Sequence, residues 1–517
     1  MWDDRYLSEL QERRQRVAVG GGAERIEKQH AAGKLTARER MELLFDEGSF
    51  TELDTMMEAI PPEEDFGLRK KLVPGDGVVI GCGTIHGRKV FASSQDFTVI
   101  GGALGETQAT KICRAMDLAY ENRAPFVSIN DSGGARIEEG ICALDGYGRI
   151  FYRNTRASGV IPQISVILGP CAGGASYSPA ISDFIFMTKE TSKMFITGPG
   201  VTKEVTGEVV SFEELGGAEM HATVSGVNHF VFEDDKGCLE GVRRLLSYLP
   251  DNNASVLVDE SQFYAPEKVD LQEVVPDNQR KTYDVRTVIT QVADKDSFLE
   301  IQEHFAQNIV IGFVRVQGKV AGVVANQPSY MGGCLDVNAS DKGARFIRFC
   351  DCFGIPIVTF VDVPGFLPGL NQERNGIIRH GAKILYAYSE ATVPKISLVL
   401  RKAYGGAYIA MNSKATGADI VYAWPIAQLA VMGAEGAVEI IYRKEIQNAE
   451  NPVARRQELI DQYNAYMMTP YIAAKKGYVD EVILPEESRR KIADALRFLQ
   501  GKKGVASPAR KHGNIPL

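Results

Sequence analysis

The chain has 517 residues, 44% hydrophobic and 24% charged, which is an ordinary globular composition but too long for a single core. Its net charge of −8 argues against nucleic acid as a main partner, and no apolar run is long enough to span a membrane. We therefore expect a cytoplasmic protein of two domains that binds no nucleic acid. The cysteines and histidines lack metal-ligand spacing, so we expect no bound metal and cysteines that act as small buried hydrophobes.

The predicted elements begin with helices over the first fifty residues. Thr36 and Glu39 form a capping-box pattern ahead of an apolar run. Further on, helical stretches such as 106–122 alternate with short β-branched runs. The near-continuous apolar runs at 164–168 and 396–400 are typical of strands buried on both faces, which indicates layered α/β domains.

The sequence repeats itself at a nearly constant offset. Asp131 and Asp362 end matched apolar runs 231 residues apart (362 − 131), and Gly-Gly-Ala at 173–175 is matched at 405–407, 232 residues on (405 − 173). A period this long predicts two domains of one fold rather than a solenoid. A duplicated fold can offer two copies of one binding device.

The junction between the two copies is predicted in the polar segment 251–283, which lacks strong periodicity. We accordingly place the domains at 1–258 and 259–517. The motif G-S-F-T-E at 48–52 is echoed by D-S-F-L-E at 296–300, so the repeat extends in this interpretation to the entrance of each domain.

Each Gly-Gly-Ala follows a predicted strand and precedes a segment able to form a helix. Glycine permits a tight turn and close approach of a ligand to the backbone, and helix-start N–H groups carry the positive end of the helix dipole. This combination suits an oxyanion hole. A single copy would more readily be explained by close packing or a phosphate cradle, but two matched copies favour two holes. The candidate catalytic residues are Gly173, Gly174, Ala175, Gly405, Gly406 and Ala407.

The residues after the two matched aspartates are predicted to line the ligand clefts. Ser132, Gly133 and Gly134 would contribute backbone donors. The alternative is that Asp131 and Asp362 cap the following helix or turn, and we favour capping for Asp362, where a Pro-Gly turn follows.

No nucleophile–base set accompanies the glycines. Ser176 follows the first Gly-Gly-Ala without a G-x-S-x-G motif or a nearby histidine, and its counterpart is Tyr408. No pair of carboxylates lies close in sequence, so no protein-supplied general base is evident. Enolate stabilisation without such a base is the pattern to explain.

Several segments resemble the biotin-dependent acyl-CoA carboxyltransferases, which include propionyl-CoA carboxylase β subunits, transcarboxylase central subunits and methylmalonyl-CoA decarboxylase α subunits. The similarity covers nearly the whole chain and implies α/β architecture with two tandem crotonase-like (ββα-spiral) domains. The segments that carry it include N-D-S-G-G-A-R-I-E-E-G (130–140), G-P-C-A-G-G-A-S-Y-S-P-A (169–180), F-V-D-V-P-G-F-L-P-G (360–369), I-I-R-H-G-A-K (377–383) and R-K-A-Y-G-G-A-Y-I-A-M (401–411).

The resemblance also implies roles for individual residues. The first Gly-Gly-Ala would hold the thioester enolate oxygen in an acyl-CoA-binding N-terminal domain, and the second would hold the ureido oxygen of biotin in the C-terminal domain of a neighbouring subunit. The substrate-binding residues would be Ser132, Gly133, Gly134, Ala135, Arg136, Ser176, Tyr177, Tyr408 and Ile409. The biotin-binding residues would be Val363, Pro364, Gly365, Phe366 and Tyr404.

The family further implies a homohexamer that receives biotin in trans, since the chain has no Met-Lys-Met biotinylation site. The partners would be a biotin carboxyl carrier protein and a biotin carboxylase subunit, and the reaction would carboxylate a coenzyme A thioester, propionyl-CoA above all. Ile409 departs from the Asp that propionyl-preferring members often carry, which leaves open a sodium-pumping decarboxylase with a membrane complex, or a transcarboxylase. A single-domain hydratase would need a catalytic Glu, and a non-catalytic scaffold subunit is the alternative of another class.

Overall fold

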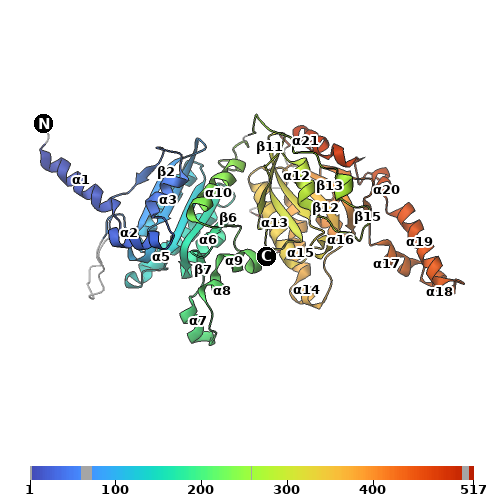
Figure 1. The fold of residues 1–517 in the computed structure, drawn as a ribbon, viewed down its shortest axis with the longest axis horizontal. Coiled ribbons are helices and arrows are strands. Elements are labelled where there is room, and N and C mark those ends of the chain that lie inside the picture. The colour runs from blue at the N-terminus through green and yellow to red at the C-terminus, as the bar shows by residue number, and fades with distance from the viewer. Residues whose placement is uncertain (1–2, 60–72, 258, 503–511, 517) are drawn as a thin grey trace. The chain divides into compact units, whose positions relative to one another are not determined.

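The computed structural model describes residues 3–59, 73–257, 259–502 and 512–516 (Figure 1). Contacts within the chain divide it into a first unit, Met1–Ser255, and a second unit, Val256–Leu517. This division falls inside the polar segment where the sequence places the domain junction. Each unit is described by itself below.

Three helices open the first unit: α1 (Asp4–Ala18), α2 (Ala23–Ala31) and α3 (Ala37–Leu44). The predicted capping box is confirmed, because Thr36 Oγ1 accepts the Glu39 N–H at 3.3 Å and Glu39 Oε2 accepts the Thr36 N–H at 2.7 Å. Helix α1 is almost wholly exposed and extends away from the sheet of its unit (Figure 1).

The first unit is built on one sheet, ordered β1-β2-β3-β4-β5-β6-β8, with β7 paired to β5. The pairs β1–β2 and β2–β3 are antiparallel and the others are parallel. The strands are β1 (Thr51–Leu53), β2 (Val78–Ile85), β3 (Arg88–Gln95), β4 (Phe126–Ser132), β5 (Gln163–Ala172), β6 (Phe184–Thr188), β7 (Lys193–Phe195) and β8 (Phe230–Phe232).

Helices cover both faces of this sheet. The pair α4 and α5 packs together on one side, and α10 packs against α3 and against strands β5 and β6 on the other (Figure 1). The remaining helical segments of the unit are η1 (Ile100–Gly102), α4 (Glu106–Glu121), η2 (Ile137–Glu139), α5 (Ile141–Ala157), η3 (Gly173–Ser176), α6 (Tyr177–Ile181), α7 (Pro199–Thr206), α8 (Phe212–Gly216), α9 (Ala218–Met220), η4 (His221–Ser225) and α10 (Asp235–Tyr248).

The second unit repeats this sheet strand for strand, in the order β9-β10-β11-β12-β13-β14-β16 with β15 paired to β13. Again the first two pairs are antiparallel and the others parallel. The strands are β9 (Leu299–Ile301), β10 (Ile309–Val316), β11 (Lys319–Asn326), β12 (Ile357–Val363), β13 (Lys395–Tyr404), β14 (Ile420–Ala423), β15 (Gln428–Ala430) and β16 (Glu481–Val482).

The helices of the second unit follow the same plan, with α13 and α15 packed together and α12 packed against α21. Helices α17, α18 and α19 extend away from the sheet (Figure 1). The helical segments are α11 (Leu271–Val274), α12 (Val285–Val292), η5 (Met331–Gly333), α13 (Val337–Cys352), α14 (Leu370–Arg374), α15 (Ile377–Glu390), α16 (Gly405–Ala410), η6 (Lys414–Thr416), α17 (Ala434–Ile441), α18 (Arg443–Asn448), α19 (Pro452–Met467), α20 (Pro470–Lys475), η7 (Pro485–Glu487) and α21 (Ser488–Phe498).

The repeat reaches the entrance of each unit, as the sequence predicts. Arg38 of α3 forms a two-pronged ion pair with Glu52 of β1, with a closest N···O distance of 2.8 Å. Arg286 of α12 forms the same pair with Glu300 of β9 at 2.6 Å. Both glutamates close the echoed motifs, so each unit ties its first helix to its first strand in the same way.

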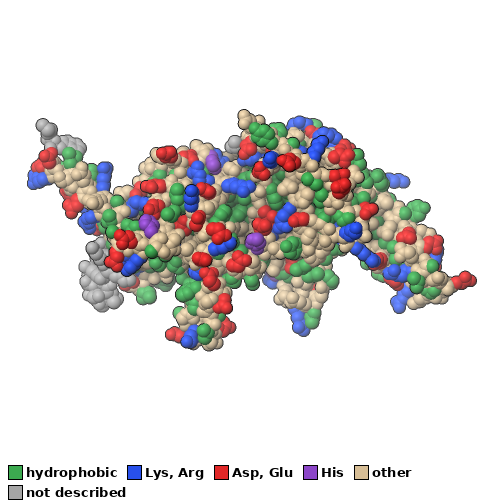
Figure 2. All heavy atoms as spheres, in the orientation of Figure 1, with side chains coloured by type: hydrophobic (Ala, Val, Ile, Leu, Met, Phe, Trp, Pro, Cys, Tyr) green, Lys and Arg blue, Asp and Glu red, His purple; other side chains and the backbone are tan. Residues whose placement is uncertain are grey.

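The surface bears charges of both signs, which lie interspersed on the face seen in Figure 2. No helix within the described ranges is long and apolar enough to cross a membrane. The prediction that the cysteines are buried is confirmed for four of them, whereas Cys82 and Cys334 are half-buried and it is wrong for Cys142 and Cys352, which are exposed. Both lie on the solvent-facing side of an amphipathic helix, where periodicity is a better guide than residue type.

Candidate active site

The two Gly-Gly-Ala segments lie where the long strands β5 and β13 turn into helices. Gly173 has a φ of +63° and Gly405 a φ of +58°, in the left-handed region that glycine adopts without strain. Segment η3 begins at Gly173 and α16 at Gly405. The first N–H groups of a helix have no acceptor within that helix, so each turn presents backbone donors.

A bulge precedes each of these turns. Strand β5 pairs with β4 in one register up to Asn130–Ile167 and resumes at Ser132–Cys171, so several residues of β5 lie opposite Asp131 alone. Past the bulge, β5 changes its other neighbour from β6 to β7. Strand β13 does the same, with the register changing between Val361–Val399 and Val363–Ala403 and its neighbour from β14 to β15.

Asp362 does not cap the Pro-Gly turn, contrary to the prediction. Its carboxylate is fully buried and accepts hydrogen bonds from Arg401 Nε at 2.8 Å and from the Lys402 N–H at 3.1 Å, both in β13. A buried carboxylate is costly without a charged partner, and a strand neighbour is nearer than the turn. The side chain therefore joins β12 to the bulge of β13.

Asp131 is held in the same position by other partners. Its carboxylate, also fully buried, accepts from Arg40 Nη1 at 2.9 Å, from Lys34 Nζ at 2.8 Å and from Gln29 Nε2 at 3.2 Å. Arg40 also donates to the carbonyl of Leu168 in the bulge of β5 at 2.8 Å. The cation thus comes from α3 rather than from the neighbouring strand.

The loop after Asp131 does not present the backbone donors that the sequence predicts at Gly133 and Gly134. The Gly133 N–H donates to the Gly101 carbonyl at 2.9 Å, and the Gly134 N–H donates to Ser132 Oγ at 3.2 Å. A Cβ built on Gly134 would lie 3.3 Å from the Ala172 carbonyl, so the loop lies against the end of β5. These N–H groups are used to shape the loop rather than to face a ligand.

The next two residues of this loop are also tied into the unit. Ala135 forms an isolated bridge with Leu104. Arg136 is 3% exposed, and its guanidinium donates to the carboxylates of Asp76 at 2.8 Å and Glu139 at 2.9 Å. The guanidinium therefore holds the loop in place.

The surroundings of the two Gly-Gly-Ala segments differ. A Cβ on Gly174 would lie 3.1 Å from the buried ring of Tyr147, whereas a Cβ on Gly406 would meet nothing within 4 Å. Beside the first segment, Ser176 Oγ donates to the Gly173 carbonyl at 2.7 Å, and Tyr177 is half exposed. The first turn is thus backed by an aromatic ring, and the second is open.

Two tyrosines flank the open turn. Burial raises the pKa of Tyr404 to about 12 and that of Tyr408 to about 12, so both phenols are protonated at neutral pH and neither is a general base. Tyr404 donates to Gln428 Oε1, and Ile409 on the following helical turn is half exposed.

The segment 363–366 begins buried and ends half-buried beside helix α15. Val363 is fully buried at the end of β12, and Phe366 forms an isolated bridge with Leu335 that matches the bridge between Leu104 and Ala135. The Phe366 ring packs on Gly381, where a Cβ would lie 2.9 Å away. Pro364 and Gly365 connect Val363 to Phe366. The structure therefore brings this segment and the second Gly-Gly-Ala to the ends of adjacent strands.

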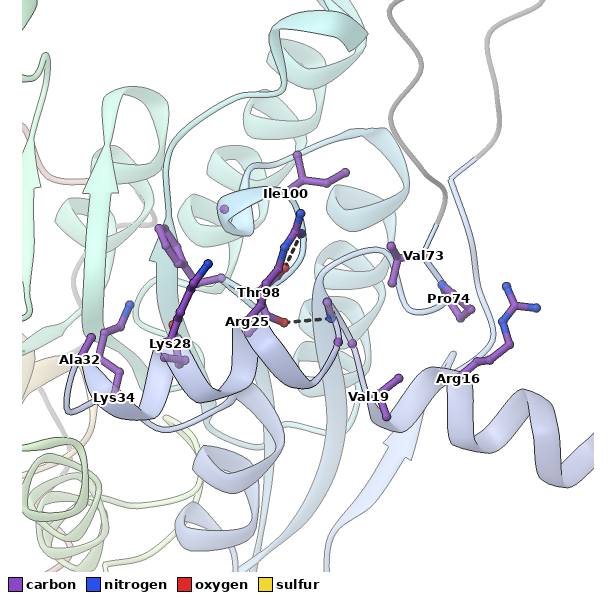
Figure 3. A pocket seen from close by; sticks show the side chains of 16 residues that line it. Arg16, Val19, Arg25, Lys28, Ala32, Lys34, Val73, Pro74, Thr98 and Ile100 are labelled. Atoms are coloured by element: carbon purple, nitrogen blue, oxygen red, sulfur yellow. Dashed lines mark hydrogen bonds between the residues drawn. The ribbon is translucent and has the colours of Figure 1, made fainter.

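An open pocket of about 960 Å³ lies in the first unit, between the N-terminal helices and the loop from Phe97 to Gly101 (Figure 3). Four cationic side chains are among its lining residues, and no acidic side chain is among them: Arg16, Arg25, Lys28 and Lys34. Arg25 donates to the Thr98 carbonyl at 2.9 Å, which fixes α2 against the loop. In Figure 3, Arg25 and Lys28 lie on α2, Lys34 lies just past the end of α2, and Arg16 lies apart from them on α1.

Sequence reasoning did not identify Lys34, Arg40, Tyr147 or this pocket. Nothing in the local pattern distinguishes Arg40, which is fully buried, from its neighbour Arg38 on the same helix. The clustering of basic residues between 13 and 40 was the available signal for the pocket. Among the residues that the structure describes, no group of His, Cys, Asp or Glu side chains could hold a metal ion.

Comparison with known proteins gives a consistent result. The carboxyl transferase domain family matches residues 28–515. The chain is 55% identical over 516 residues to the methylmalonyl-CoA decarboxylase subunit alpha of Propionigenium modestum, and 54% identical over 513 residues to the propionyl-CoA carboxylase carboxyltransferase subunit of Haloferax mediterranei, covering 99% of each chain in both cases.

The fold also matches a solved structure. The crystal structure of the transcarboxylase 12S hexamer, with methylmalonyl-coenzyme A and methylmalonic acid bound, superimposes with a TM-score of 0.96 at 54% identity. The match covers 100% of this chain and 99% of that one. The predicted pair of crotonase-like α/β domains is confirmed.

Proposed function

Because the chain belongs to the carboxyl transferase domain family, we propose that it is the carboxyltransferase subunit of a biotin-dependent acyl-CoA carboxylase. It would transfer CO2 between carboxybiotin and the α-carbon of a short acyl-CoA, with propionyl-CoA and methylmalonyl-CoA as the pair. The observation that carries this proposal is the matched geometry of the two Gly-Gly-Ala turns, each placed after a bulge in a buried strand.

Each turn would act as an oxyanion hole. The N–H groups of Gly173, Gly174 and Ala175 would hold the thioester oxygen as it gains negative charge, and the enolate would attack CO2 from that position. The N–H groups of Gly405, Gly406 and Ala407 would hold the ureido oxygen of biotin. Fixed donors in a site that excludes water gain strength because no solvent has to reorganise.

The missing general base is consistent with this chemistry. The tyrosines beside the second turn remain protonated, and Ser176 donates to a carbonyl rather than to a histidine. When bound, carboxybiotin would supply the CO2, and the ureido nitrogen freed by its loss would take up the α-proton. The chain's own part is to bind, to orient and to exclude water.

The pocket in the first unit supports an acyl-CoA as the substrate there. Its cationic side chains suit the phosphates of coenzyme A, since ammonium and guanidinium groups bind phosphate by charge-assisted hydrogen bonds. Lys34 lines the pocket and also contacts Asp131, opposite the bulge of β5. A coenzyme A bound in the pocket would thus lead toward the first turn.

The second turn would bind biotin. A Cβ on Gly406 would meet no atom within 4 Å, so the space over this turn is open where Tyr147 fills the matching space in the first unit. Phe366, Tyr404 and the segment 363–365 would form the sides of this site. Ser176, Tyr177 and the loop 132–136 would shape the acyl end in the first unit, and Tyr408 and Ile409 would do so from the C-terminal domain of a neighbouring subunit.

The transcarboxylase 12S subunit assembles as a hexamer in a multienzyme core. We expect this chain to be a cytoplasmic homohexamer that receives biotin on a carrier protein charged by a biotin carboxylase subunit. Light scattering on the purified chain tests the hexamer, and affinity purification followed by mass spectrometry tests the partners.

The activity is tested by assaying the pure protein for biotin-dependent decarboxylation of malonyl-CoA and methylmalonyl-CoA. Turnover that requires biotin is expected, and it should be higher with methylmalonyl-CoA. Absence of turnover with both substrates contradicts the proposal. A panel of acetyl-, propionyl- and butyryl-CoA in the carboxylation direction then determines which acyl group fits beside Ile409.

A second candidate function is favoured by the identity of 55% with a methylmalonyl-CoA decarboxylase subunit alpha. In that case the same site would run in the direction of decarboxylation within a membrane complex, or would transfer the carboxyl group between two acyl compounds, as a transcarboxylase does. Co-purified proteins separate these functions, since a biotin carboxylase supports the first candidate and a membrane pump the second. A non-catalytic scaffold would show no biotin-dependent turnover with any partner.

A further inference from the structure

The bulges of β5 and β13 lie four residues before Gly173 and Gly405, and each is held by a buried carboxylate with a guanidinium partner, to which Lys34 adds a second cation at Asp131. In the first unit, a Cβ on Gly169 would lie 1.9 Å from Asp131 Oδ1, so the carboxylate rests on the bulge itself. In the second unit, the matching position is Arg401, which pairs with Asp362 at 2.8 Å. Bulges redirect a strand and increase its twist, so whatever holds the bulge also determines where the following turn lies.

The ion pairs supply hydrogen bonds that the bulged ladder lacks. The Leu168 carbonyl accepts from Arg40 Nη2 at 2.8 Å, and the Lys402 N–H donates to Asp362 Oδ1 at 3.1 Å. Arg401 Nη1 also donates to three carbonyls of the segment 276–281. Because buried backbone groups require partners, loss of these bonds would let the bulge shift.

Each aspartate is itself fixed from the other side by a matched amide side chain. Gln95 Oε1 accepts the Asp131 N–H at 3.2 Å, and Asn326 Oδ1 accepts the Asp362 N–H at 3.2 Å. The two amides occupy matched positions at the ends of β3 and β11. Three adjacent strands therefore meet at each aspartate, directly before the Gly-Gly-Ala turn.

We propose that these two carboxylate–guanidinium pairs are the positioning residues of the two oxyanion holes, Asp131 with Arg40 for the thioester and Asp362 with Arg401 for biotin. This inference rests on the proposed function. None of the four side chains touches the reacting atoms; they set the direction of the N–H groups that do. The pairs act separately, so each should influence the polarisation of one ligand only.

The experiment uses the full chain with Arg40→Lys and Arg401→Lys, which keep the charge and remove the second guanidinium arm. Infrared spectra are recorded with propionyl-CoA labelled with ¹³C at the thioester carbonyl, and with biotin labelled at the ureido carbon. In the unaltered protein each carbonyl stretch should move to lower frequency on binding. Arg40→Lys should reduce the thioester shift alone, and Arg401→Lys the ureido shift alone.

Both variants should also slow biotin-dependent decarboxylation of methylmalonyl-CoA by roughly 10- to 100-fold, because misplacement of about 1 Å costs on that order. The matched controls are Arg38→Lys and Arg286→Lys, whose ion pairs with Glu52 and Glu300 lie at the entrances of the units. They should leave both carbonyl shifts unchanged.

The proposal is overturned if either variant reduces both shifts equally, reduces neither, or behaves like its control. If a lysine variant does not fold, Gln95→Asn and Asn326→Gln, which exchange the two amide lengths without changing charge, should give the same separation of effects. Failure of the proposed function looks different, because then the unaltered protein would show neither carbonyl shift nor turnover.

Discussion

The two units share a sheet, a bulge and a buried aspartate, but they obtain the cation for that aspartate from different places. In the second unit Arg401 lies in the bulged strand itself, so the pair is complete within the sheet. In the first unit the matching residue is Gly169, and Arg40 reaches the site from helix α3. A duplicated fold can thus keep the position of a charge while changing the element that provides it.

This difference has a functional consequence. Arg40 lies in the same N-terminal segment as Lys34 and Gln29, which line the basic pocket and contact Asp131. The first unit therefore connects its basic pocket to its bulge, whereas in the second unit the buried pair of Arg401 and Asp362 lies within the sheet. Under the proposed function, this difference would suit a large anionic substrate in the first unit and a small tethered group in the second.

The largest expected effect is a loss of turnover when the open turn at Gly406 is blocked by a larger side chain. Gly406→Val should lower turnover by about 100-fold or more, because its side chain fills the space over the turn and displaces N–H donors worth about that much. Coenzyme A binding, measured by calorimetry, should remain. Gly200→Val is the matched control, since it also changes the second residue of a helix with nothing within 4 Å. Equal turnover in the two variants would contradict an oxyanion hole at Gly406.

The next largest effect is a difference in the unfolding free energy lost when Asp362 or Asp131 is replaced by Asn. Asp362→Asn should lower the free energy of unfolding by about 3–5 kcal/mol, because it leaves a buried arginine without a carboxylate. Among the described residues, Arg401 pairs with Asp362 alone, while Arg40 also pairs with Asp235 at 2.8 Å. Burial lowers the pKa of Lys34, so this amine can lose its proton when Asp131 is replaced.

Asp131→Asn should therefore destabilise its unit less than Asp362→Asn destabilises the other. Urea unfolding followed by circular dichroism measures both variants. Equal destabilisation would show that the source of the cation does not matter, and the reverse order would contradict the prediction.

A smaller effect concerns the ring behind the first turn. Gly174→Ala should lower the free energy of unfolding by about 1–3 kcal/mol, since its Cβ would lie 3.1 Å from the Tyr147 ring in a packed core. Gly406→Ala should change it by less than about 0.5 kcal/mol, because the space there is open. Thermal unfolding compares the two, and Tyr147→Leu should relieve the first variant. An equal loss of unfolding free energy in Gly174→Ala and Gly406→Ala would mean that the two turns have the same surroundings.

The smallest effect is a pH-dependent change in stability at an aspartate that binds the turn of the β2–β3 hairpin, which is matched at the β10–β11 hairpin. Asp46 accepts the Gly87 N–H at 2.9 Å and pairs with Arg243 of α10, as Asp294 accepts the Gly318 N–H at 2.8 Å and pairs with Arg489 of α21. Burial opposes ionisation of Asp46, but hydrogen bonds from Gly87, Arg243, Thr84 and His86 hold its pKa well below the usual value.

A lowered carboxyl pKa stabilises the folded state above the unfolded value near 3.8, and this contribution is lost as the pH falls toward the folded value. Asp46→Asn should thus be less stable than the unaltered protein at pH 7, by about 1 kcal/mol or less because the site is partly exposed. The gap should begin to narrow below about pH 4 and shrink further as the pH falls toward the folded pKa. A gap that stays constant from pH 7 to pH 3 would exclude ionisation of Asp46 as its cause.

The sequence by itself determined the duplication, the layered α/β fold and the places of the two glycine turns. These follow from local causes: near-continuous apolar runs form strands buried on both faces, and Gly173 and Gly405 adopt a backbone conformation that favours glycine. The matched motifs at 48–52 and 296–300 also predicted the matched entrances of the units.

Only the tertiary structure decided which polar groups meet. The partners Asp131 and Arg40 are 91 residues apart in the chain, and Asp362 and Arg401 are 39 apart. Long-range packing determines whether an arginine reaches a carboxylate or stays at the surface, so neither pair could be read from its neighbours in sequence. For the same reason the loop at Gly133 and Gly134 looked like a source of donors, although its N–H groups are bonded within the unit.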